Sequence, residues 1–190
     1  MGGDEMSLEA RRKTPLERLL SPIADVRQEE AASALLMALV MFLILAAYYL
    51  LKTARESLIL SIENGAELKA YSSAAQAVLL LGVVPAYSWL ASRVPRVPLI
   101  GITTAFLGVN LLAFAALYAT GTVIAVPFYI WLGIYNVFTI SQFWAFTNDL
   151  YTEGQGRRLF AFIGVGSSLG AWLGAEAAAT LVKRTTSDPR

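Results

Sequence analysis

Residues 97–148 read VPLIGITTAFLGVNLLAFAALYATGTVIAVPFYIWLGIYNVFTISQFWAFTN, a run of 52 residues without one charged side chain. A helix that crosses a bilayer needs roughly 20 apolar residues, so this run is long enough for two crossings. Residues 119–122 (ATGT) lie near its middle and have the composition of a turn. The run therefore predicts two membrane helices joined by a short loop.

The flanking sequence repeats this pattern on both sides. Residues 34–51 and 70–92 are also uncharged, and residues 159–182 are interrupted only by Glu176. We expect an all-α polytopic membrane protein with about five spans, at residues 34–62, 70–92, 97–119, 123–148 and 158–182. Residues 1–33 would then be a cytoplasmic N-terminal segment, residues 34–182 the transmembrane domain and residues 183–190 a tail.

Composition supports the same class and excludes others. The chain is 56% hydrophobic and 15% charged, against about 25% charged in soluble domains, and its mean hydropathy is +0.57. A net charge of +1 gives no reason to expect a nucleic-acid partner. Cysteine and histidine are absent, which removes thiol chemistry and the commonest metal ligand. We expect no enzyme activity, no metal and no cofactor.

Basic residues alternate between the loops and predict an orientation. Those on the expected N-terminal side are Arg11, Arg12, Lys13, Arg18, Arg27, Arg93, Arg96, Arg157 and Arg158. Because Lys and Arg are enriched in cytoplasmic loops, the N-terminus is expected in the cytoplasm. Lys183 and Arg184 count against this scheme. Before the first span, Leu16, Leu19, Leu20 and Ile23 have helical spacing and predict either interfacial helices or a solvated tail.

The first span contains three charges near its far end, in residues 48–60 (YYLLKTARESLIL). Lys52 and Arg55 could reach the outer interface and end the helix. They could instead face a wet interior site, because apolar residues continue beyond them and lipid-facing charges are costly. Tyr48, Lys52 and Arg55 share a helical face, and Glu56 can meet Lys52 across one turn. Two cations and one anion in an interior site would favour an anionic solute.

Residues 143–160 (FWAFTNDLYTEGQGRRLF) join the fourth and fifth spans. Asn148 and Asp149 precede the turn, and Arg157 and Arg158 follow it. These groups predict either a cytoplasmic gate whose ion pairs form in one conformation and break in another, or an ordinary charged loop. Gly154 and Gly156 suggest a flexible turn.

Three glycines mark one stripe of the last span. Gly166, Gly170 and Gly174 recur every fourth residue, which permits close approach of another helix. Glu176 lies just beyond them and could face a cavity or reach the outer interface.

Two segments carry a resemblance to a known family. KTARESLILS (residues 52–61) followed by GAELK (65–69), and FWAFTND (143–149) followed by RRLFAFIGVGSSLG (157–170), are similar to the nucleotide (ATP/ADP) transporters of plastids and intracellular bacteria. The similarity runs in order over nearly all of residues 34–182. That family is related to the major facilitator transporters, and the basic turn at residues 93–96 falls at one of their cytoplasmic loops.

The resemblance implies a function and assigns residues to it. Arg55 would bind nucleotide phosphate, with Lys52 and Glu56 in the accompanying basic and acidic positions, and transport would be ATP:ADP antiport by alternating access. Family members that exchange nucleotides have a glutamate early in the fourth span, where this chain has an uncharged residue near Leu132, as in the broader bacterial relatives.

Length is the second departure from that family. Such transporters have two six-helix halves with the substrate between them, so the chain resembles an incomplete N-terminal half. A second half or a partner membrane chain is therefore expected, in the cell's inner membrane. The alternative is a non-transporting membrane module that assembles with a partner through the glycine stripe or regulates it.

Overall fold

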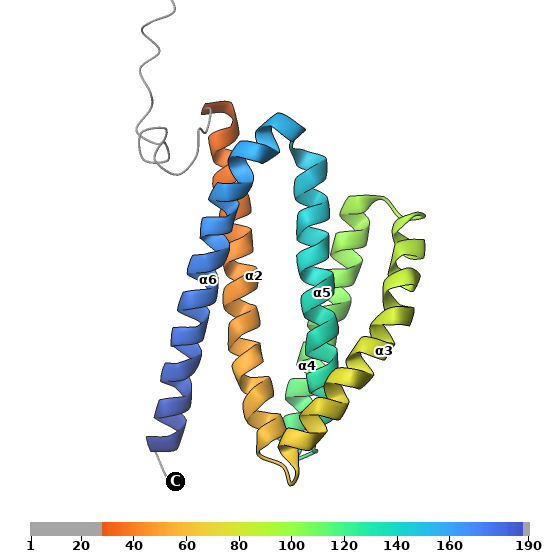
Figure 1. The fold of residues 1–190 in the computed structure, drawn as a ribbon, viewed down its shortest axis with the longest axis vertical. Coiled ribbons are helices and arrows are strands. Elements are labelled where there is room, and N and C mark those ends of the chain that lie inside the picture. The colour runs from red at the N-terminus through yellow and green to blue at the C-terminus, as the bar shows by residue number, and fades with distance from the viewer. Residues whose placement is uncertain (1–27, 188–190) are drawn as a thin grey trace, which may run out of the picture.

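The computed structural model describes the backbone of residues 28–187 and the side chains of residues 30–183. The described residues form five helices joined by short turns, without a strand (Figure 1). These are α2 (Gln28–Leu60), α3 (Gly65–Ala91), α4 (Arg96–Ala119), α5 (Ala125–Leu150) and α6 (Glu153–Ser187). The interfacial helices expected before residue 28 lie outside the described residues.

Four of the helices have the length and apolar composition of a membrane span. They are Glu30–Leu60, Gly65–Ala91, Arg96–Ala119 and Glu153–Lys183. The expected span over residues 123–148 forms as α5, which contains polar side chains such as Asn136 and Gln142 and is not among these four. This helix is the inner one of the bundle, so much of its surface meets protein. The prediction of an all-α polytopic membrane protein is confirmed.

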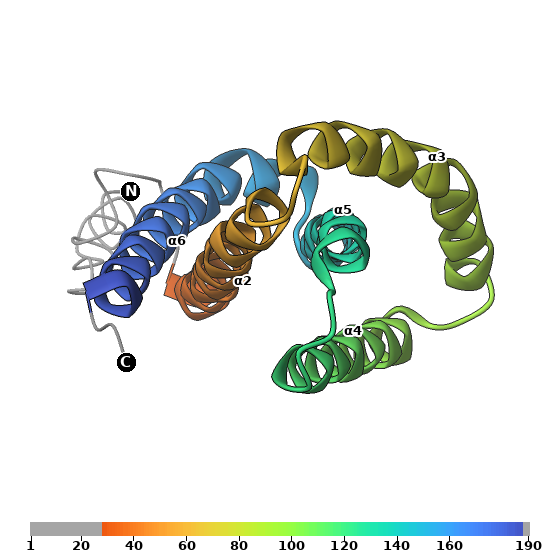
Figure 2. The same ribbon diagram turned by 90° about the horizontal axis from the view of Figure 1, so that it is seen from below.

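The helices pack around α2 and α5. The longest interface joins α2 to α6, and α5 contacts α2, α3 and α4. Figure 2 shows α6 and α2 on one side of α5, and α3 and α4 on the other. The main apolar core lies where α2 and α6 meet, with Ala34, Met41, Leu159 and Ile163 buried there together with Phe143 of α5.

Both outer helices expose large apolar side chains. Leu81 of α3 is 77% exposed and Leu112 of α4 is 71% exposed. Apolar surface on this scale is unusual for a soluble monomer and marks contact with a membrane or with another protein. The exposed faces of α3 and α4 therefore fit lipid contact.

The loops divide between the two ends of the bundle as the sequence predicts. Figure 1 shows the start of α2, the α3–α4 turn and the α5–α6 turn at one end, which we name the basic end because Arg93, Arg96, Arg157 and Arg158 belong to it. The α2–α3 and α4–α5 turns lie at the opposite end.

Two helix boundaries differ from the expected ones by several residues. The first described helix, α2, already includes Gln28, whereas the sequence predicted a start at residue 34. The last helix begins at Glu153 rather than residue 158, so the expected flexible glycine turn is helical. The Gln155 Oε1 accepts hydrogen bonds from the backbone N–H of Thr152 (2.9 Å) and from its hydroxyl (3.1 Å). This arrangement is half of a capping box, and it starts the helix early.

Candidate functional site

The charged residues at the far end of α2 form a cluster with the start of α3. Arg55 Nη2 lies 3.1 Å from Glu56 Oε1, and Lys69 Nζ lies 2.5 Å from Glu56 Oε2. We name these three residues the α2–α3 charge cluster. The turn between the helices is short and includes Asn64 in a left-handed conformation with φ 56°, which brings Lys69 back to Glu56. One carboxylate is therefore shared by two cations.

Arg55 points into the protein rather than toward lipid. It is 9% exposed, and its guanidinium carbon lies 4.1 Å from the centre of the Tyr129 ring on α5. The Tyr129 hydroxyl is hydrogen bonded to Ser73 of α3 at 3.0 Å. Arg55 Nε is buried and has no hydrogen-bond partner in the described part of the chain. The guanidinium thus retains hydrogen-bonding capacity that the described residues do not use.

The other two residues expected at this site lie apart from that cluster. Lys52 is partly exposed, with Nζ 5.3 Å from the centre of the Tyr49 ring. Tyr48 packs edge-on against Tyr49, with ring centres 5.7 Å apart. The expected pairing of Glu56 with Lys52 is wrong in this conformation, because Glu56 pairs with Arg55 and Lys69 instead. The helix continues to Leu60, so neither cation ends it.

The residues around the α2–α3 charge cluster determine how much negative charge lies near Arg55. Glu63 and Glu67 lie in the same turn region, but both are exposed. Leu132, the uncharged residue in the expected position of a family glutamate, is fully buried one turn beyond Tyr129 on α5. Among the described residues, the carboxylate paired with the buried Arg55 guanidinium is therefore that of the partly buried Glu56.

At the basic end, Glu30 joins α2 to α6. Arg158 Nη2 lies 3.1 and 3.2 Å from the two Glu30 carboxylate oxygens, and Gln155 Nε2 donates to Glu30 Oε1 at 2.9 Å. Glu30 is only 8% exposed. This carboxylate was not singled out from the sequence, because its partners lie more than 120 residues along the chain.

The remaining gate residues pair with other groups. Asp149 accepts hydrogen bonds from Arg96 at 2.8 and 3.4 Å, which joins α5 to α4. Arg157 pairs with Glu153 within α6 at 2.6 Å, in an exposed position. Asn148 is exposed. The four expected gate residues therefore do not pair with one another in this conformation, and Arg96 enters the network unpredicted.

The glycine stripe of α6 lies against α2. A Cβ atom added at Gly166, Gly170 or Gly174 would collide with the backbone carbonyl of Ala38, Phe42 or Ala46, respectively. The two backbones are therefore too close for any larger residue without a shift. The stripe is covered by α2, so it is not the open surface for a partner that the alternative function required. Glu176, beyond the stripe, is exposed.

Together these features define a class of protein: a multi-pass α-helical membrane protein with ionisable groups buried between its helices. A family model described as TLC ATP/ADP transporter matches residues 8–127. The chain therefore belongs to the TLC ATP/ADP transporter family, and the expectation from the α2 and α3 motifs is confirmed at that level. The second pair of motifs, in α5 and α6, lies outside the matched residues. No curated protein and no solved structure matches the chain.

Proposed function

We propose that the chain takes part in transporting an anionic solute, a nucleotide, across the membrane by alternating access. Arg55 and Lys52 would contact the phosphate groups. The observation that supports this most is the state of Arg55, whose guanidinium is buried against Tyr129, has an Nε without a partner among the described residues, and shares the carboxylate of Glu56 with Lys69. Arginine forms strong, oriented hydrogen bonds with phosphate oxygens.

Glu56 would act as the counter-ion of the empty site. A phosphate group could replace its carboxylate on Arg55, and the Glu56 carboxylate would keep its ion pair with Lys69. Lys69 therefore has a role in the proposal that the sequence did not indicate. Arg55 and Lys69 would each be paired with an anion in the empty site and in the loaded site. This pairing limits the cost of placing charges within a membrane.

The ion pairs of the basic end supply the proposed gate. Glu30 with Arg158 connects α2 to α6, and Asp149 with Arg96 connects α5 to α4. Breaking such pairs would let the helices separate at this end. We propose that this end and the N-terminus are cytoplasmic, because basic residues are enriched in cytoplasmic loops. The protein would lie in the inner membrane. A second six-helix half would complete the pathway.

Uptake of labelled ATP into proteoliposomes that contain the purified chain together with a complete second half, and that enclose ADP, tests this function. The wild type should accumulate ATP, and Arg55→Ala should lower the initial rate about tenfold or more, since a hydrogen bond to a charged group contributes about 1.5–3 kcal/mol. Lys52→Ala should lower it less. Arg93→Ala is the matched control, because Arg93 also lies over an aromatic ring, Trp89, at 4.1 Å but belongs to no part of the proposed site.

Retained fold is checked for each variant by circular dichroism and gel filtration, and Arg55→Lys provides a second, milder change. If the initial rate of ATP uptake by Arg55→Ala equals that of the wild type, the assignment of Arg55 to the phosphate groups is wrong. Absence of uptake by the wild type in the presence of a complete second half would reject transport altogether.

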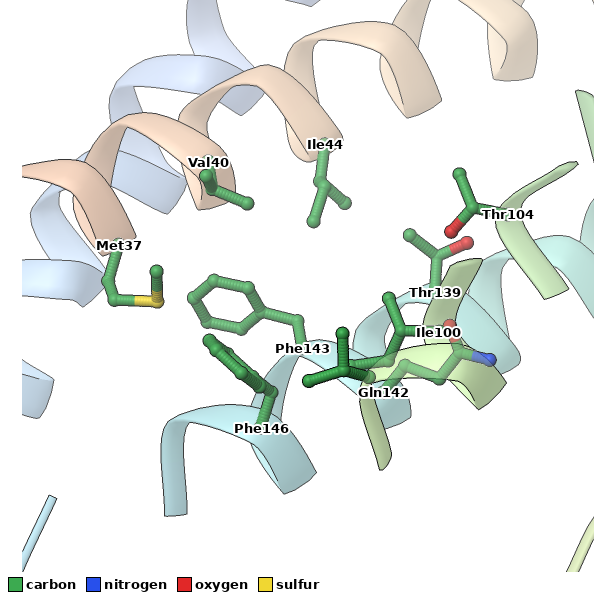
Figure 3. Close-up of a pocket in the computed structure, with 10 residues that line it drawn as sticks. Met37, Val40, Ile44, Ile100, Thr104, Thr139, Gln142, Phe143 and Phe146 are labelled. Atoms are coloured by element: carbon green, nitrogen blue, oxygen red, sulfur yellow. The ribbon is translucent and has the colours of Figure 1, made fainter. Parts of the chain in front are cut away.

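A second candidate is the non-transporting module that assembles with a partner. The glycine stripe cannot serve it, since α2 covers that stripe. A cavity of about 480 Å³ lined by apolar residues of α2, α4 and α5 (Figure 3) favours this candidate instead, because side chains of a partner could pack into it. The uptake assay separates the two functions.

A further inference from the structure

A short basic turn, residues 92–95, joins α3 to α4 at the basic end. It contains Arg93, and Arg96 follows as the first residue of α4. Arg96 is paired with Asp149. Arg93 is exposed and makes no ion pair within the part of the chain that the structure describes. The turn therefore has a cation whose charge no described carboxylate balances.

Arg93 lies over an exposed aromatic ring. Its guanidinium carbon is 4.1 Å from the centre of the Trp89 ring, and Trp89 is 56% exposed in the last turn of α3. Tryptophan is enriched where membrane helices meet the lipid headgroups. The ring covers a face of the guanidinium, and no described residue accepts a hydrogen bond from its N–H groups. Those donors suit a headgroup phosphate, which arginine binds through oriented hydrogen bonds.

The start of α4 adds backbone donors to the same turn. The helix begins at Arg96 after Pro95, which provides no side-chain cap. The backbone N–H groups of Arg96 and Val97 have no carbonyl of a preceding helical turn to bond, and the N-terminus of the helix is partially positive. Phosphate groups bind at such helix ends. The arginine and the helix end therefore favour the same kind of ligand.

A cavity lies between α3, α4 and α5 next to this turn, with a volume of about 320 Å³. Its walls include Val83, Ala86 and Leu90 of α3, Ile102 and Phe106 of α4, and Phe138 of α5. Leu90 connects the cavity to the turn, because its carbonyl oxygen accepts the backbone N–H of Arg93 at 3.0 Å. Ile102 and Phe106 are 60% and 62% exposed, so the cavity wall continues into the exposed apolar face of α4. A hydrocarbon chain could enter the cavity from that face.

We propose that the α3–α4 turn and this cavity form a binding site for an anionic phospholipid. The phosphate contacts Arg93 and the start of α4, and an acyl chain lies in the cavity. Cationic pockets between membrane helices on the cytoplasmic side bind anionic headgroups. Figure 2 shows the turn at the edge of the bundle away from α2 and α6. A soluble phosphate compound shares the headgroup chemistry but would leave the apolar cavity unfilled. The inference does not depend on which solute the chain moves.

Native mass spectrometry of the purified chain in detergent tests the proposal. The chain is titrated with phosphatidylglycerol or with phosphatidylcholine that has the same acyl chains, and the bound fraction gives the apparent affinity. We expect tighter binding of phosphatidylglycerol, and Arg93→Ala should weaken that binding about fivefold, the effect of one basic residue near an anionic headgroup. Equal affinities for the two lipids, or an unchanged affinity in Arg93→Ala, would overturn the proposal. Displacement of the lipid by glycerol phosphate, which has no acyl chain, would assign the turn to a soluble phosphate compound instead.

Two variants test the parts of the site separately. Arg157→Ala is the matched control, because it removes an exposed cation at the same end that is paired with Glu153 within α6, and it should bind lipid like the wild type. Ala86→Phe fills the cavity from an exposed position and should weaken phosphatidylglycerol binding while Arg93 stays in place. An unchanged affinity would remove the acyl chain from the cavity and reject the site as proposed. If Ala86→Phe does not fold, Thr103→Phe changes another wall residue.

The same titration with a complete second half present tests what covers this surface. We expect phosphatidylglycerol to remain bound, and its loss would show that further helices of the transporter occupy the site, which would overturn the proposal. No measurement here involves ATP, and Figure 1 shows the turn at the opposite end of the bundle from the α2–α3 turn. The lipid proposal and the nucleotide proposal can therefore fail separately. In membranes of phosphatidylcholine alone the anionic lipid is absent, so Arg93→Ala remains a control for the nucleotide site.

Discussion

The interface between α2 and α6 can be tested with two glycines of the same helix. An alanine at Gly170 would collide with the Phe42 carbonyl oxygen, whereas an alanine at Gly164 would meet nothing within 4 Å. Replacing glycine by alanine inside a helix is favourable by about 1 kcal/mol, and this gain is common to both variants. Overpacking a close contact costs about 1–3 kcal/mol. Gly170→Ala should therefore be about 1–3 kcal/mol less stable than Gly164→Ala.

Unfolding of the purified chain by SDS in detergent micelles, followed by circular dichroism, measures this difference. The Gly164→Ala midpoint should equal or exceed that of the wild type, and the Gly170→Ala midpoint should fall below both. The comparison cancels helix propensity, so only the contact with α2 separates the variants. Equal midpoints for the two alanine variants would refute the close approach of the helices.

Three further predictions concern the ion pairs and the tyrosine. Glu30→Gln should lower the unfolding free energy by about 1–3 kcal/mol, because Arg158 then loses a buried ionised acceptor; an unchanged SDS midpoint would contradict this. A double-mutant cycle of Arg96→Ala and Asp149→Ala should give a coupling of only about 0.2–1 kcal/mol that shrinks in high salt, since both side chains are substantially exposed; a large, salt-independent coupling would show a buried pair. Tyr129→Leu should cost about 0.5–2 kcal/mol through loss of the contact with the Arg55 guanidinium, and a variant as stable as the wild type would argue against that contact.

The number and order of the helices in residues 28–187 could be predicted from the sequence, because uncharged runs of membrane length are separated by short charged or turn-forming segments. The ends of the helices were harder to predict from the sequence. The sequence TEGQ at residues 152–155 contains the capping signal that starts α6 at Glu153, but the neighbouring glycines suggested a turn. The inner position of α5 could not be read from length alone, although its amide side chains are a sign of protein contact.

The site was predictable in part for a similar reason. Charges inside an apolar helix identify Arg55 and Glu56 without any structure, because such charges need a partner. Their partners are set by tertiary packing: Lys69 is 13 residues from Glu56, and Tyr129 lies on another helix. Helical spacing favoured Lys52 as the partner of Glu56, and the short turn before α3 overrides it.

The same limit applies at the basic end. Asp149 was matched with the nearby arginines of α6, but its partner Arg96 is 53 residues away and approaches through the packing of α4 on α5. The glycine stripe of α6 could be recognised from its period of four. The helix that packs against this stripe could not be predicted, because the spacing of the glycines identifies a helix face and not the helix that contacts it.

Equilibrium binding of labelled ATP to the purified chain in lipid nanodiscs tests the central proposal most directly, because it reports on the phosphate contact without requiring transport. Arg55→Ala should weaken the apparent affinity about tenfold or more, as expected for loss of a charged hydrogen bond of about 1.5–3 kcal/mol, while Arg93→Ala should bind like the wild type. Equal ATP affinity of the wild type and Arg55→Ala, with both folded, would contradict the assignment of Arg55 to the anion site.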